Sequence, residues 1–364
     1  FKGDVQGVRI DGAIQKPFVA HIAADVGYAE DLEFEVSGDW QGLRWPFTGP
    51  VDISSRQGSL QLQGRTDAYR LSLAGDLQRP DAPPLQIKLS GQGDQAGVRL
   101  LDGDIKTLNG RLQPRGEVSW SPDVKWQIDL ALVDIDPGAH WKDWSGRLNG
   151  AARVKGGIRP AGPAIAFSLQ DLSGELRGYP VGARGTANLL DGQLEIPGAD
   201  LSLGDNHLSL QGRIGDRLQL DWTLSAPDLA QIAPAGSGAI TGTGSLRGTT
   251  DKPQLRAQLE GQGLHYADQS LERLSLDLTW TDQVVALAAE LSTLVIGAQQ
   301  VDDMRLEVSG TQEKHALTAE LLRGEDKFTL QASGGWRESA WSGLIQSITL
   351  DAVSYTHLRA HETS

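Results

Sequence analysis

The stretch RLSLDLTW, residues 273–280, decides the fold of this 364-residue chain. Leu274, Leu276, Leu278 and Trp280 alternate strictly with hydrophilic residues. An alternation of this period places the apolar side chains on one face of an extended strand and the hydrophilic side chains on the other. The stretch therefore predicts a β-strand with one apolar face and one wet face.

The same alternation recurs from one end of the chain to the other. It is clearest at 85–89, 126–132, 165–169, 218–224, 304–308 and 328–332, while the only helical turn that we expect is a short one at 228–232. Gly, Asp, Asn and Pro interrupt it roughly every eight to twelve residues, a spacing typical of antiparallel hairpins. We therefore expect an all-β fold.

The composition excludes several classes of partner. The formal net charge is −14, whereas nucleic acids and anionic membrane surfaces attract basic proteins. The chain has no cysteine, which excludes a disulfide framework and thiol chemistry. It also lacks a run of about 18 apolar residues that could span a bilayer.

Two similar phrases, SGRLNGAARVKG (145–156) and SGAITGTGSLRG (237–248), indicate internal repeats offset by 92 residues. Each follows a second shared phrase, WQIDLALVDIDP or LQLDWTLSAPDLAQIAP. Repeats of long period without linkers favour a stacked sheet over separate globules. We expect one continuous repetitive segment over 1–350, with repeats at about 110–205 and 206–300 and a partial one at 301–350.

Both ends of the sequence depart from this pattern. The final residues, VSYTHLRAHETS (353–364), lose the alternation and are similar to translated vector sequence, so we expect a non-native tail. The chain begins with Phe1 and shows no signal peptide. We therefore expect an internal piece of a longer protein.

Motifs that would carry chemistry are weak. GTGSLRGTTDKPQL (242–255) places its third glycine one residue late for a dinucleotide fingerprint, and no helix follows it. We interpret it as a repeat boundary where glycine lets the sheet bend and Pro253 starts a strand.

The chain has seven scattered histidines, so we expect no metal and no cofactor. Three acidic pairs are expected on wet faces or turns, namely Asp102/Asp104, Asp134/Asp136 and Asp302/Asp303.

The apolar face is larger than any motif, and we expect it to be the functional surface. Trp126 and Trp222 lie in phase with the leucines, so we expect tryptophans on that face too. A continuous sheet can shelter such a face only by curling into an open groove, and an acyl chain gains about 0.8 kcal/mol per CH₂ buried there. The expected lining residues are Leu208, Leu210, Leu218, Leu220, Trp222, Leu224, Leu255, Leu259, Leu274, Leu276, Leu278 and Trp280.

A series of phrases resembles the TamB family of AsmA-like envelope proteins. They are WQGLRWPFTGP (40–50), VDIDPGAHWKDWSGRLNG (133–150), APDLAQIAPAGSGAITGTGSLRGTTDKPQL (226–255) and LHYADQSLERLSLDLTW (264–280). The resemblance implies a non-enzymatic periplasmic bridge. Its hydrophobic groove would conduct phospholipids between inner and outer membranes, with a linked role in outer-membrane protein assembly. It also implies the outer-membrane partner TamA and an inner-membrane anchor outside this chain.

Two alternatives share the all-β pattern. A structural or adhesive β-solenoid would have a closed, dry interior built from short, regular coils, whereas the repeats here are long and irregular. A chaperone groove for outer-membrane β-strands would use the sheet edge, by adding a strand to it.

Overall fold

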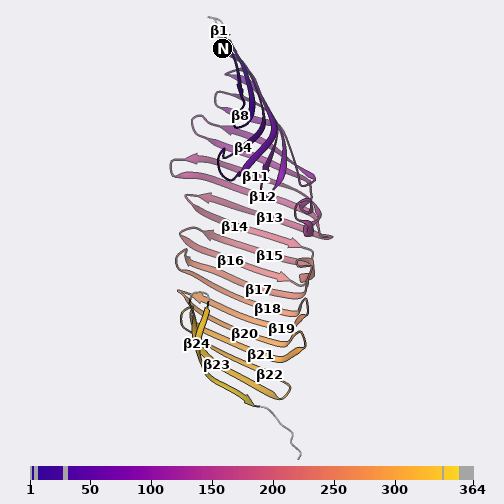
Figure 1. Ribbon diagram of the computed structural model, residues 1–364, viewed down its shortest axis with the longest axis vertical. Helices are drawn as coiled ribbons and strands as arrows, with labels where there is room; N and C mark the ends of the chain where they lie inside the picture. Colours follow the sequence, from indigo (N-terminus) through magenta and orange to yellow (C-terminus); the bar gives the residue numbers. More distant parts are fainter. Residues whose placement is uncertain (1, 4–6, 28–31, 338–339, 352–364) are drawn as a thin grey trace, which may run out of the picture. The chain divides into compact units, whose positions relative to one another are not determined.

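The computed structural model describes residues 2–3, 7–27, 32–337 and 340–351 (Figure 1). Nearly all of them lie in β-strands, and the exceptions are turns and three-residue 3-10 helices. The all-β prediction is confirmed. No helix in this part of the chain is long and apolar enough to cross a membrane. The predicted tail at 353–364 lies outside the described residues.

The chain divides into two units, residues 1–201 and 202–364, which we describe separately. The first unit contains β1 (Lys2–Gly3), β2 (Gly7–Ile14), β3 (Val19–Gly27), β4 (Glu33–Trp45), β5 (Ile53–Arg65), β6 (Ala68–Arg79), β7 (Ala82–Asp94), β8 (Gly97–Thr107), β9 (Gly110–Ser119), β10 (Lys125–Ile135), η1 (Pro137–Ala139), η2 (Lys142–Trp144), β11 (Gly146–Arg159), β12 (Gly162–Leu176), β13 (Tyr179–Leu190) and most of β14 (Gln193–Leu203).

The second unit begins at residue 202. It contains β15 (Asn206–Ile214), β16 (Arg217–Ala226), η3 (Leu229–Gln231), β17 (Gly236–Thr249), β18 (Pro253–Tyr266), β19 (Gln269–Thr281), β20 (Val284–Ile296), β21 (Gln299–Thr311), β22 (His315–Arg323), β23 (Asp326–Arg337) and β24 (Ala340–Asp351).

In both units the strands form an open antiparallel meander. Consecutive strands pair with each other from β1 through β13, and again from β15 through β24. Figure 1 shows β15 to β22 side by side like the rungs of a ladder. Among the described residues, β24 pairs with β23 alone, so the sheet is not closed. The predicted open, curled sheet is confirmed.

The hydrophobic core is thin. The buried hydrophobic residues are alanines and Ile135, and no large side chain in the described part of the chain is fully buried. The accessible surface is 23963 Å² for 39.0 kDa, against roughly 14,000 Å² for a globular monomer of that mass. Within each unit, no second layer of described residues therefore covers the sheet in the way that a facing sheet covers a sandwich.

The repeated phrases adopt the same local structure. Asp136 accepts a hydrogen bond from the amide of Gly138 and caps η1, and Asp228 accepts one from Ala230 and caps η3. The 3-10 turn at 228–232 is thus confirmed. The strands that follow these turns, β11 and β17, carry the aligned glycine phrases. How the repeats extend over 1–350 stays a prediction.

A carboxylate holds a β-bulge in the first unit. The register of β5 against β6 shifts between Ser54 and Gly58. Asp76 of β6 accepts hydrogen bonds from the amides of Gln57 (2.9 Å) and Arg56 (3.2 Å) and from Arg56 Nε (3.1 Å). Burial acts to raise the pKa of Asp76, but these hydrogen bonds and the Arg56 charge outweigh it and hold the pKa below its ordinary value.

Asp76→Asn tests this bulge. Because the folded-state pKa is depressed, the hydrogen bonds stabilise the fold above the unfolded-state pKa, and this stabilisation is lost as the pH falls through the folded-state value. The variant should lose about 1–3 kcal/mol of unfolding free energy at neutral pH and depend less on acid pH. Urea unfolding at neutral and acid pH measures both effects. The exposed Asp39 of β4 provides the control, Asp39→Asn, and equal behaviour of the two variants would contradict the assignment.

Candidate functional site

All of the predicted groove residues lie in the second unit. Leu208 and Leu210 are on β15, and the others are on β16 (Leu218, Leu220, Trp222, Leu224), β18 (Leu255, Leu259) and β19 (Leu274, Leu276, Leu278, Trp280). Their side chains are half-buried, except that of Trp280, which is 40% exposed. Side chains on an apolar face are expected to be half-buried when only their neighbours on the same face cover them.

The strand register brings these residues into rows that cross the sheet, because directly paired residues of neighbouring strands share a face. One row, here called the leucine row, runs Leu208, Leu224, Gly242, Leu259, Leu276, Ala289, Leu306, Ala319, Leu330 and Ile348. A second row, here called the tryptophan row, runs Leu210, Trp222, Gly244, Ala257, Leu278, Leu287, Val308, Leu317, Ala332 and Ile345. The apolar face is thus continuous from β15 to β24.

Three small residues, Gly242, Ala289 and Ala319, interrupt the leucine row. Gly242 separates Leu224 from Leu259, and a Cβ at Gly242 would overlap Cδ2 of Leu259. Farther along, Ala289 and Ala319 separate Leu276, Leu306 and Leu330. Since strands are only about 4.8 Å apart, each small residue gives its large neighbour room to lie against the sheet. The resulting surface is closely packed and apolar.

Tryptophans lie over glycines on this face in both units. Trp222 is paired with Gly244, and a Cβ on that glycine would overlap the indole. The first unit repeats the arrangement with Trp126 over Gly156, and with Trp40 over Gly58. Trp222 and Trp280 share the leucine face as predicted, since Trp222 pairs with Leu210 and Trp280 with Leu255.

The glycine-rich stretch 242–248 is therefore strand and not a phosphate-binding loop. It lies inside β17, with Gly242 and Gly244 in the two apolar rows, while the turn falls at 250–252 and Pro253 starts β18 as predicted. These glycines allow close packing of side chains, whereas from the sequence we expected them only to let the backbone bend.

The apolar face also contains residues that the sequence reading left out of the lining set. Their alternation was visible in the sequence, but the row that each one joins depends on register. They are Ile240 and Leu246 of β17 and members of β20 to β23, namely Leu287, Leu291, Met304, Leu306, Val308, Leu317, Leu321, Phe328 and Leu330.

The opposite face is hydrophilic and carries cross-strand ion pairs. Arg305 meets Glu290 at 2.9 Å, and Arg247 meets Asp221 at 2.5 Å. A hollow of about 490 Å³ on this face is lined mainly by hydroxyl, amide and carboxylate side chains of β16 to β19. In it, Gln258 donates to Asp277 at 2.9 Å, so its polar groups bond to one another. Sequence reasoning missed this hollow.

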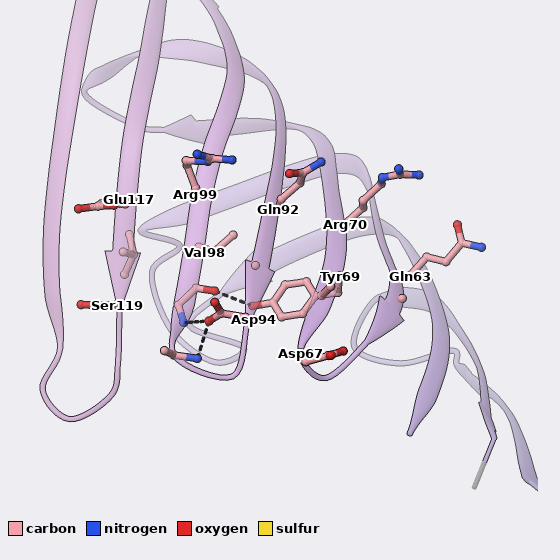
Figure 2. Close-up of a pocket in the computed structure, with 16 residues that line it drawn as sticks. Gln63, Asp67, Tyr69, Arg70, Gln92, Asp94, Val98, Arg99, Glu117 and Ser119 are labelled. Atoms are coloured by element: carbon pink, nitrogen blue, oxygen red, sulfur yellow. Dashed lines mark hydrogen bonds between the residues drawn. The ribbon is translucent and has the colours of Figure 1, made fainter. Parts of the chain in front are cut away.

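The first unit has a hollow of about 760 Å³ near the β7–β8 turn, which Figure 2 shows. Tyr69 lies over Gly93 and donates to the carbonyl of Gly97 at 3.3 Å. Asp94 accepts from the amides of Ala96 and Gly97. Burial first, and the Asp94 charge second, raise the pKa of Tyr69, which keeps its phenol protonated at neutral pH. These contacts hold the hairpin together.

Two of the three predicted acidic pairs, Asp134/Asp136 and Asp302/Asp303, have structural partners, whereas Oδ1 of Asp104 is buried without a hydrogen-bond partner in the described part of the chain. Asp134 pairs with Arg147 at 3.6 Å, and Asp303 accepts from Ser292 at 2.9 Å. Asp302 accepts from the Gly324 amide and Gln300, and these hydrogen bonds lower its pKa. Within the described residues there is no group of three or more His, Cys, Asp or Glu that could hold a metal ion.

Fold and site together define a class of protein: an open antiparallel sheet with a long apolar face whose side chains stay largely half-buried within the described part of each unit. The chain matches the family model described as "TamB, N-terminal domain" over residues 1–361. The protein belongs to the TamB family, as the sequence phrases predicted.

A curated relative is the translocation and assembly module subunit TamB of Haemophilus influenzae. It is 22% identical over 305 residues, which cover 80% of this chain and 23% of the relative. The chain therefore spans less than a quarter of the length of that protein. No solved structure matches the chain.

Gly244→Ala tests the packing of the tryptophan row. The added methyl group must displace the Trp222 indole, so we expect a loss of about 1–3 kcal/mol of unfolding free energy. Gly198→Ala is the control, because nothing lies within 4 Å of a Cβ placed there. Adding Trp222→Leu to Gly244→Ala should recover part of the loss. If Gly244→Ala is as harmless as Gly198→Ala in urea unfolding, the close contact does not matter for stability.

Proposed function

We propose that the apolar face conducts phospholipids between the inner and outer membranes, with a linked role in assembling outer-membrane proteins. The protein would act in the periplasm, held by an inner-membrane anchor outside this chain, beside the partner TamA. Family membership supports a translocation and assembly role. The lipid role is inferred from the surface itself, and it requires neither a catalytic residue nor a cofactor.

The observation that carries the proposal is the unbroken apolar surface of the second unit. Nine strand spacings from β15 to β24 make it roughly 43 Å wide across the strands. One acyl chain fills half of a hydrocarbon core about 30 Å thick, so the surface can hold more than one chain end to end. Monomers rarely expose apolar patches beyond a few hundred Å² without a ligand or partner.

The repetitive character of the apolar surface suits transport. Each CH₂ gains about 0.8 kcal/mol when it leaves water. The repeated leucines and small residues offer many similar binding positions for an acyl chain, one after another across the sheet. A chain can therefore move from one position to the next without meeting a single deep well. We expect no individual lining residue to be essential.

The last described strand of the second unit suits one alternative, a chaperone groove for outer-membrane strands. Leu344, Ile348 and Leu350 of β24 are 66%, 56% and 65% exposed, and this strand pairs with β23 alone among the described residues. An incoming strand could extend the sheet there. The open meander lacks the closed coils of a solenoid, which counts against that third reading.

Photo-crosslinkers at Leu220 and Leu276 separate transport from the chaperone role. In the full-length protein in cells we expect phospholipid adducts at both positions. Ser275, next to Leu276 on β19 and on the hydrophilic face, should give no lipid adducts. Protein adducts in place of lipid adducts at the leucines would favour the chaperone groove.

Charge in the groove tests the same proposal functionally. Leu276→Arg or Leu220→Asp should block phospholipid transport between the membranes without preventing assembly, because a lone charge among acyl chains is costly to desolvate. Ser275→Arg puts the same charge on the opposite face and should leave transport intact. If transport survives several such changes at one level of the sheet, the conduit does not exist.

A further inference from the structure

One loop of the first unit exposes aromatic side chains that the fold does not need. It connects β10 to β11 and reads His140-Trp141-Lys142-Asp143-Trp144. Trp141 is 49% exposed and Trp144 is 37% exposed. Tryptophan side chains are costly to leave in water, so such a pair marks a surface that contacts something.

The second unit contains the same loop without these side chains. At the offset of 92 residues, Ile232, Ala233, Pro234 and Gly236 stand where His140, Trp141, Lys142 and Trp144 stand in the first unit. Both loops begin with an aspartate that caps a 3-10 turn, and both lead into a long strand. The scaffold therefore forms with small residues, and the exposed tryptophans need an explanation other than folding.

A cation lies against this loop from the neighbouring hairpin. Arg177, in the turn between β12 and β13, places its guanidinium 5.7 Å from the centre of the Trp144 ring. Its amide donates to the carbonyl of Ser145 at 2.7 Å, which ties the turn to the loop. Arg177 has φ of 55°, a conformation that asparagine and glycine adopt more readily than arginine. The turn thus keeps an arginine at a position where the backbone prefers other residues.

This loop lies on one rim of the apolar face. In a meander, the connections that follow even-numbered strands all fall at the same end of the strands. The β2–β3 and β4–β5 connections of this rim hold a further aromatic cluster, in which Phe47 stacks on Phe18 at 5.9 Å and meets Trp45 at 5.0 Å. Trp45 and Phe47 are both at least half exposed.

Aromatic rings beside cations are typical of sites that meet the polar part of a lipid. Tryptophan favours the level between acyl chains and headgroups, and arginine is suited to phosphate. Lys142 adds a second cation, and Asp143 adds an anion, in a chain of net charge −14. The mixture of signs fits a zwitterionic headgroup better than an anionic one.

We propose that Trp141, Trp144 and Arg177 form a headgroup site on this rim for a zwitterionic phospholipid whose acyl chains lie on the apolar face of the first unit. This proposal rests on the proposed lipid-conducting function, and it identifies the rim along which the headgroups travel. Arg177 and Lys142 contact the phosphate, and the indoles lie against the glycerol esters. The apolar row next to this rim includes Leu112, Leu132 and Leu172.

Site-specific photo-crosslinking on the purified 364-residue chain tests this site. The crosslinker benzoylphenylalanine replaces Trp141, and the control replaces Ala233 at the equivalent position of the second unit. A third chain carries it at Leu132, to report acyl-chain binding by itself. The probes are dioctanoyl phosphatidylcholine and dioctanoylglycerol, which have the same chains and differ by the headgroup.

We expect phosphatidylcholine adducts at 141, few at 233, and adducts of both probes at 132. Arg177→Asn should cut the phosphatidylcholine adduct at 141 about tenfold, since a charged hydrogen bond is lost, and Arg177→Lys should keep most of it. Asparagine suits the turn at φ of 55°, so the first variant should fold at least as well as the parent.

The outcomes separate the site from the function. Adducts at 132 with none at 141 would overturn the headgroup site and leave the conduit standing. Equal yields of the two probes at 141, unchanged by Arg177→Asn, would also overturn it, because the loop would then be a non-specific apolar contact. No adduct of either probe at any position would overturn both the conduit and the site.

Discussion

The rest of the structure depends on one constraint: in each unit, the antiparallel sheet has an apolar face that no second layer of described residues covers. In a sandwich, a facing sheet would bury these side chains completely. Here a side chain is covered mainly by its neighbours along the same face, so most large apolar residues stay half-buried or exposed, and the buried apolar residues are alanines and Ile135. Cohesion therefore comes from the backbone ladder and from packing across strands.

That constraint explains why small residues matter as much as large ones. Gly244 lets the Trp222 indole lie flat, and Gly156 does the same for Trp126. Without a facing layer, an upright indole would stand in solvent. The small residues thus let their large neighbours lie against the sheet and bury more apolar surface than upright side chains would.

Much of this was predictable from residue patterns, and the remainder depended on register. Alternation at 273–280 is local, so it predicted the strand β19 and its apolar face. The pairing of Trp222 with Gly244 joins residues from different strands, and no local pattern states which residue stands opposite which. The Asp76 carboxylate likewise meets the β5 bulge only through the β5–β6 register. Trp141 and Trp144 were visible in the sequence as part of a phrase that resembles the TamB family. Their exposure could not be predicted there, because exposure is a property of the fold.

The central claim is that the apolar face takes phospholipid, and native mass spectrometry of the chain purified from a bacterial envelope tests it most directly. The account predicts folded protein carrying masses that correspond to intact phospholipids, released on activation in the gas phase. A folded chain that stays free of lipid, even after incubation with phospholipid vesicles, would contradict it.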